Sequence, residues 1–122
     1  MLCIFQAANL LATLASLSFT VSWTHSVEQT SWQEDWQIRP AGLFLVEARI
    51  QGSGAGMEPP PSARLAGGWW VYSPSLPPLP ELVLAASGAT GAGWQICGGD
   101  QCFRIGENAG EPVRLRACPG KP

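Results

Sequence analysis

The sequence predicts a single all-β domain, a small antiparallel β-sandwich or partly closed barrel of about 8–10 short strands. Its 122 residues are enough for one hydrophobic core but not for two. The 14 Gly and 11 Pro residues separate short bursts rich in Val, Ile, Thr and Trp, a composition typical of strands joined by turns. Several bursts alternate apolar and polar residues with a period of two, which indicates strands with one buried face.

The N-terminal region has no charged residue before Glu28 apart from the chain terminus and the titratable His25. We expect it to form strands at Leu2–Phe5 and Leu10–Leu14. Residues 1–17 are also open to a second interpretation, as a residual export signal or a membrane anchor, although no Lys or Arg precedes the apolar run and polar residues interrupt it. At the other end, residues 118–122 are expected to form a frayed tail.

Two strands with period-two alternation follow, at residues 19–28 and 31–38. A tight hairpin turning at Gln29-Thr30 would place His25 opposite Glu34 and Trp23 opposite Trp36. Gln-Thr is poor chemistry for such a turn, so a longer irregular loop is the alternative. In either case, we expect the apolar face to contain the three tryptophans Trp23, Trp32 and Trp36.

A strand apolar on both faces is predicted at residues 43–50, with Glu47 and Arg49 on the same face as Leu43 and Leu45. We therefore predict one polar cluster on the apolar face, consisting of His25, Glu34, Glu47 and Arg49. Buried polar groups are costly alone but satisfy one another as a pair, so the simplest role for His25 and Glu34 is to fix the strand register.

The glycine-rich loop after this strand contains Gly52, Gly54, Gly56 and Met57. It is not a dinucleotide-binding loop, because three prolines at positions 59–61 prevent the helix that such a motif requires. Further strands are predicted on both sides of Gly67-Gly68 and at Leu82–Ala86. The proline-rich residues 73–81 read as a semi-rigid connection between them.

The clearest hairpin spans residues 94–105, with Gly99-Asp100 as its turn. This register pairs Ile96 with Phe103 on one face and Cys97 with Cys102 on the other, at a distance that a disulfide accepts. We predict that disulfide, and with it an oxidising compartment. The alternative is two reduced thiols. Whether Cys3 and Cys118 form a second bridge does not follow from the sequence.

Charge and motifs exclude several classes of function. The net charge is −2 and the seven Lys and Arg residues are scattered, so no basic patch is available for nucleic acid. We predict no cofactor and no metal site. A site built from His25, Glu34 and Glu47 has suitable side chains but no supporting motif.

Six segments of the chain have a common resemblance: residues 19–28, 32–36, 45–49, 52–57, 68–72 and 79–82. Together they resemble a small bacterial family, the domain of unknown function numbered eighteen-fifty. Members of that family are typically encoded beside, or fused to, the permease of TRAP-type (tripartite ATP-independent periplasmic) transporters of the TAXI class. The resemblance therefore implies an accessory role near such a transporter, on the periplasmic side, and supplies no catalytic residue or ligand.

Three functions are weighed. The first is a non-enzymatic accessory or interaction domain, with transporter components as partners. The second is a small-solute-binding domain whose pocket is lined by tryptophans together with His25 and Glu34. The third, a hydrolase or metal-dependent enzyme using His25 and Glu34, lacks a catalytic motif. We expect a periplasmic protein, or one on the periplasmic face of the inner membrane. A cytoplasmic location is the alternative because no clear signal peptide is present.

Overall fold

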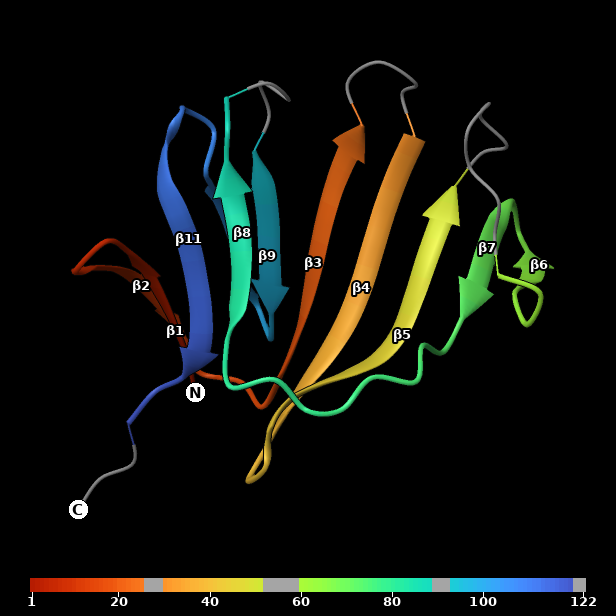
Figure 1. Ribbon diagram of the computed structural model, residues 1–122, viewed down its shortest axis with the longest axis horizontal. Helices are drawn as coiled ribbons and strands as arrows, with labels where there is room; N and C mark the ends of the chain where they lie inside the picture. Colours follow the sequence, from red (N-terminus) through yellow and green to blue (C-terminus); the bar gives the residue numbers. More distant parts are fainter. Residues whose placement is uncertain (26–29, 52–59, 89–92, 120–122) are drawn as a thin grey trace.

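The computed structural model describes residues 1–25, 30–51, 60–88 and 93–119, with His25 described by its backbone alone. In this part of the chain eleven strands form two antiparallel sheets (Figure 1). The strands are β1 (Leu2–Gln6), β2 (Asn9–Leu14), β3 (Ser18–His25), β4 (Thr30–Arg39), β5 (Gly42–Gln51), β6 (Arg64–Ala66), β7 (Trp69–Tyr72), β8 (Leu82–Ala86), β9 (Trp94–Gly98), β10 (Gln101–Ile105) and β11 (Gly110–Ala117).

The two sheets are separate, which confirms the predicted all-β sandwich. One has four strands in the order β2-β1-β11-β8, and the other has seven in the order β10-β9-β3-β4-β5-β7-β6. Figure 1 shows β3, β4, β5 and β7 side by side as the body of the larger sheet. The strands expected near the N-terminus form as β1 and β2. No helix in the described residues is long and apolar enough to span a membrane.

The hydrophobic core lies between the two sheets and takes side chains from both. Ile4, Val113 and Leu115 of the smaller sheet are fully buried, as are Val21 and Ile96 of the larger one. Each of these residues occupies a position of the period-two pattern that faces inward. The inner face of the larger sheet is therefore the side that bears the core, and its outer face is the opposite side.

The register of β3 against β4 differs from the predicted hairpin. Trp23 lies opposite Trp32, Phe19 opposite Trp36, and the backbone of His25 opposite Thr30. The predicted pairing of His25 with Glu34 is therefore wrong, because Glu34 lies opposite Val21. Thr30 is the first residue of β4 and not part of a two-residue turn, and the connecting residues 26–29 lie outside the described part. The poor turn chemistry of Gln-Thr was the signal for this longer connection.

A β-bulge in β5 overturns a second prediction. Trp36 lies opposite Leu45 but Asp35 lies opposite Glu47, so Val46 is an extra residue without a partner. Leu43 and Leu45 face the core, whereas Glu47 and Arg49 emerge on the outer face. Period-two counting predicts all four on one face because it assumes an uninterrupted strand.

Residues 73–81 form the predicted connection between β7 and β8, and they thereby join the larger sheet to the smaller one. Leu79 is joined to Leu43 by two backbone hydrogen bonds, in which each amide donates to the other's carbonyl at 2.7 and 2.9 Å. Gly42 makes this close approach feasible: its φ is +131°, and a Cβ there would lie 2.5 Å from the carbonyl oxygen of Leu79. The connection is thus fastened to the start of β5.

Two disulfides are present. Cys97 and Cys102 form the predicted cross-strand bridge, and the register of β9 against β10 is the predicted one throughout. The second bridge, which the sequence left open, joins Cys3 to Cys118 across a separation of 115 residues. Two disulfides are typical of proteins from an oxidising, extracytoplasmic environment.

The two bridges should differ in their contribution to stability. The longer loop loses more entropy when it is closed. Replacing Cys3 and Cys118 by Ser should therefore lower the free energy of unfolding by up to about 5 kcal/mol, whereas the same replacement of Cys97 and Cys102 should lower it by about 2 kcal/mol. Urea titration of the two double variants, each with its other bridge intact, measures the difference. Equal losses, or free thiols at either pair in the non-reduced protein, would contradict this expectation.

Candidate functional site

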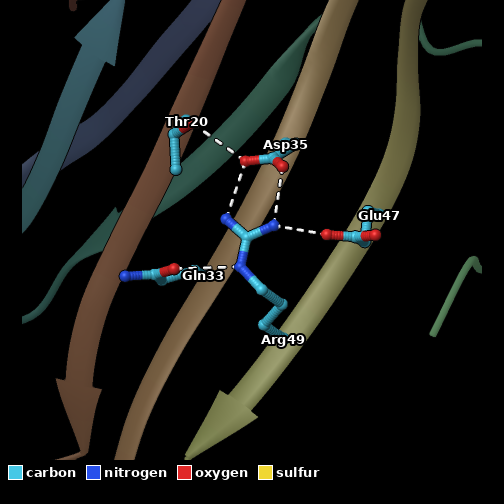
Figure 2. Close-up of polar contacts among 5 residues, drawn as sticks. All are labelled: Thr20, Gln33, Asp35, Glu47 and Arg49. Atoms are coloured by element: carbon cyan, nitrogen blue, oxygen red, sulfur yellow. Dashed lines mark hydrogen bonds and ion pairs between the residues drawn. The ribbon is translucent and has the colours of Figure 1, made fainter. Parts of the chain in front are cut away.

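The outer face of the larger sheet contains a connected set of polar side chains around Arg49 (Figure 2). The Arg49 guanidinium donates to both carboxylate oxygens of Asp35, at 2.6 and 2.9 Å, and to Glu47 Oε2 at 2.6 Å. Its Nε donates to Gln33 Oε1 at 3.0 Å. The hydroxyl of Thr20 completes the set by donating to Asp35 Oδ1 at 2.9 Å. We call these five residues the Arg49 cluster.

The Arg49 cluster joins three adjacent strands. Thr20 lies on β3, Gln33 and Asp35 on β4, and Glu47 and Arg49 on β5. The bulge at Val46 brings the last two onto the same face as the others, since it shifts every following residue of β5 by one position. The cluster is therefore a product of the sheet register and not of any local sequence motif.

Hydrogen bonds within the cluster hold Asp35 and Arg49 in their charged forms. The hydrogen bonds from Arg49 lower the pKa of the Asp35 carboxyl, and the hydrogen bond from Thr20 lowers it by a smaller amount. Together they outweigh the effect of partial burial, which raises this pKa. The hydrogen bonds to Asp35 and then Glu47 raise the pKa of Arg49. The side chains of Arg49, Asp35 and Glu47 are 20%, 36% and 30% exposed, so the ion-paired set is accessible to solvent.

Two cavities lie beside the cluster. The larger, of about 450 Å³, is lined by Thr20, Asp35, Gln37, the bulge residue Val46 and Cys97, among others. The smaller, of about 240 Å³, has a lining that includes Ser22, Ser31, Gln33, Gln51, Trp69, Gln95 and Arg104. One cavity thus borders Asp35 and the other borders Gln33, which places the cluster between them.

A second group of interest lies on the inner face of the same sheet. Trp23 and Trp32 stack with ring centroids 5.7 Å apart, and Trp94 packs on Trp23 at 4.8 Å. The indole nitrogen of Trp32 is buried and has no hydrogen-bond partner in the described part of the chain. Such a donor is costly to bury. This group is distinct from the Arg49 cluster because it faces the other side of the sheet.

Glu34 is the acidic member of this inner face. It accepts a hydrogen bond from the indole nitrogen of Trp36 at 3.2 Å, and burial raises the pKa of its carboxyl above the ordinary value. Across Ala48 on the neighbouring strand lies Tyr72. Burial, followed by the charge of Glu34, raises the pKa of the Tyr72 hydroxyl.

The predicted cluster of His25, Glu34, Glu47 and Arg49 is divided by the sheet. Glu47 and Arg49 are paired on the outer face, Glu34 points inward, and the side chain of His25 lies outside the described part. A metal site shared by Glu34 and Glu47 is excluded by their opposite orientation. Among the described residues, no group of three His, Cys, Asp or Glu side chains is placed to hold a metal ion.

The predicted tryptophan pocket and the predicted glycine loop do not join the Arg49 cluster. Trp36 is buried in the core against Phe19, with ring centroids 6.4 Å apart, whereas Trp23 and Trp32 stack with each other. The predicted Trp pocket is therefore two separate aromatic groups. The glycine loop with Gly52, Gly54, Gly56 and Met57 lies outside the described residues.

Thr20, Gln33 and Asp35 are site residues that the sequence did not reveal. Each lies on the polar side of a strand with period-two alternation, a position that by itself indicates only a solvent-facing side chain. The signal that could have found them is the charge balance: Asp35 and Glu47 on neighbouring strands need a cation, and Arg49 is near in sequence. Only the bulge, however, brings Arg49 to their side.

The raised pKa of Glu34 predicts a dependence of stability on pH. Because the folded-state pKa lies above the unfolded value, this carboxyl contributes stability at low pH that is lost as the pH rises through the folded pKa. Glu34→Gln keeps an oxygen for Trp36 but cannot ionise. The variant should therefore gain in Tm relative to the parent chain as the pH rises from about 4 to about 8.

Thermal melts across that range test this expectation. Glu107→Gln, at an exposed position, controls for the loss of one surface charge. A Tm difference between Glu34→Gln and the parent chain that grows as the pH falls would contradict the burial of a carboxylate at Glu34.

Comparison with known proteins gives one finding. Residues 19–105, which include the Arg49 cluster and both aromatic groups, match the model of the family described as domain of unknown function, DUF1850. Neither the curated proteins nor the solved structures yielded a match. Because the family model covers more than half of the chain, the protein belongs to the DUF1850 family.

Proposed function

We propose that this protein is a non-enzymatic accessory domain of a TRAP/TAXI-type solute transport system and that it acts by binding through the outer face of its larger sheet. The observation that carries the binding role is the Arg49 cluster. It is accessible, and its charged groups are already held in one geometry by mutual hydrogen bonds. Polar groups fixed in advance lose little freedom when a ligand or partner arrives.

The same contacts favour binding over catalysis. A general base needs a carboxylate with a pKa near the working pH and a free lone pair directed at the substrate. Asp35 is the reverse: its pKa is lowered, and both of its oxygens accept hydrogen bonds from Arg49. Glu47 also accepts from Arg49. We therefore propose that the outer face is not an active site.

The transporter association and the periplasmic location rest on other grounds. The association comes from the resemblance to a family encoded beside or fused to TRAP-type permeases. The two disulfides support an oxidising compartment, of which the periplasm is the one adjoining such a permease. An accessory domain there would meet either the solute or the periplasmic surface of the transporter.

A second candidate function is small-solute binding on the inner face, near Trp23 and Trp32. The observation that favours it is the unpaired indole nitrogen of Trp32, a buried donor in an aromatic setting close to Glu34. Small-molecule sites combine such apolar walls with a few convergent polar groups. A ligand bearing a hydrogen-bond acceptor would satisfy this nitrogen. Such a ligand would stabilise the domain in a thermal-shift screen of metabolites.

Transport measurements test the first proposal. Deletion of the gene should reduce uptake of the substrate of the neighbouring transporter, and the parent chain should restore it. Arg49→Gln should fail to restore uptake because it removes the cation that orders Asp35 and Glu47. Arg116→Gln on the smaller sheet is the matched control and should restore it.

Each variant must be shown to accumulate in folded form in the periplasmic fraction. Unchanged uptake in the deletion strain would overturn the accessory role. Full restoration of uptake by Arg49→Gln would show that the accessory role does not depend on the Arg49 cluster of the outer face.

A further inference from the structure

The outer face of the larger sheet has a regular pattern of polar side chains that extends beyond the Arg49 cluster. The strand registers arrange its side chains in rows that run across the sheet. One row contains Thr24, Ser31, Gln51 and Trp69, the next contains Arg104, Gln95, Ser22, Gln33, Arg49, Val71 and Arg64, and the third contains Cys97, Thr20, Asp35 and Glu47. We call these three rows the polar face.

Hydroxyl and planar polar groups dominate the polar face. The outward residues of β3 are Ser18, Thr20, Ser22 and Thr24, so every one of them bears a hydroxyl. The facing residues of β4 are Gln37, Asp35, Gln33 and Ser31, and beyond the last three lie Glu47, Arg49 and Gln51 of β5. The charged groups among them are largely bonded to one another, but a side-chain amide carries an NH2 donor beside a carbonyl acceptor, and this pair can engage two neighbouring hydroxyl groups of a ligand.

The charges of the polar face nearly cancel. Its cations are Arg49, Arg64 and Arg104, and its anions are Asp35 and Glu47. Arg49 is paired with both carboxylates, and Arg104 also has an interaction partner. A face with one excess cation gives little electrostatic attraction to a polyanion or a polycation, so it favours an uncharged polar ligand.

The two cavities lie one after the other along β3 and β4. Thr20 and Asp35 line the larger cavity, and Ser22 and Gln33, the next outward residues of the same two strands, line the smaller one. Such positions lie about 7 Å apart along a strand. The smaller cavity also contains Trp69, which is half-buried and offers an aromatic surface among the hydroxyls and amides.

From this arrangement we propose that the polar face binds a neutral oligosaccharide, with consecutive sugar units in the two cavities. Hydroxyls and planar polar groups match the paired donors and acceptors of sugar hydroxyls. The ring of Trp69 supplies an apolar surface for the C–H face of one sugar ring. Within the Arg49 cluster, Asp35 borders the larger cavity and Gln33 the smaller one, and both are held in place by hydrogen bonds from Arg49. The inference rests on the proposed role of the outer face as a binding surface, and it names the ligand class.

NMR titration of the purified, oxidised full chain tests the ligand class. The probes are maltotriose, cellotriose and chitotriose, with inorganic phosphate as the charged comparison. At least one trisaccharide should give saturable shifts of the Trp69 indole and of the side-chain amides of Gln33 and Gln51. Phosphate should give none.

Two variants of the polar face and one control variant locate the binding site. Trp69→Ala and Gln33→Ala should each weaken trisaccharide binding by about tenfold, a change of about 1.4 kcal/mol. Val83→Ala, at an exposed position on β8 of the smaller sheet, should leave binding unchanged. Binding unaffected by both face variants would overturn the proposal, as would the absence of saturable shifts with all three sugars, or saturation by phosphate alone.

Failure of this inference is distinguishable from failure of the accessory role. If no trisaccharide binds and Arg49→Gln still fails to restore uptake, the ligand class is wrong and the outer face remains the binding surface. If a trisaccharide binds on the polar face and deletion leaves uptake unchanged, the ligand class stands without the transporter.

Discussion

The unpaired residue Val46 determines the chemistry of both faces of the larger sheet. Without this bulge, the register that pairs Trp36 with Leu45 would continue, and Glu47 would lie opposite Glu34 on the inner face. Two carboxylates would then face each other there, with Arg49 beside Trp32. With the bulge, Ala48 and Ile50 take those inward positions, each only 3% exposed. One extra residue thus keeps two charged side chains, Glu47 and Arg49, off the inner face, and it prevents the repulsion between Glu34 and Glu47.

The same shift creates the candidate site. Glu47 and Arg49 emerge beside Asp35, and the guanidinium of Arg49 bonds three of its neighbours. Bulges are frequent next to functional sites because they redirect side chains without disturbing the rest of a sheet. Val46 itself lines the larger cavity. The fold and the proposed binding role therefore have a common origin in the pairing of β4 with β5.

Much of the fold followed from the sequence because alternation and turn chemistry are local. The hairpin of Cys97 and Cys102 was predicted in its register, since Gly99 supplies the turn and fixes the pairing. The site did not follow. The bulge leaves no mark in composition, so Glu47 and Arg49 were assigned to the wrong face. The pairing of His25 with Glu34 failed because the connecting loop is longer than the two residues assumed.

The central claim is the interrupted register of β4 against β5, and NMR of the oxidised protein measures it directly. Cross-strand nuclear Overhauser effects should join Trp36 to Leu45 and Asp35 to Glu47, with Val46 left without a facing partner on β4. They should also join Glu34 to Ala48. Effects that join Asp35 to Val46 and Glu34 to Glu47 would show an uninterrupted strand. That result would contradict the outer-face cluster and the binding role built on it.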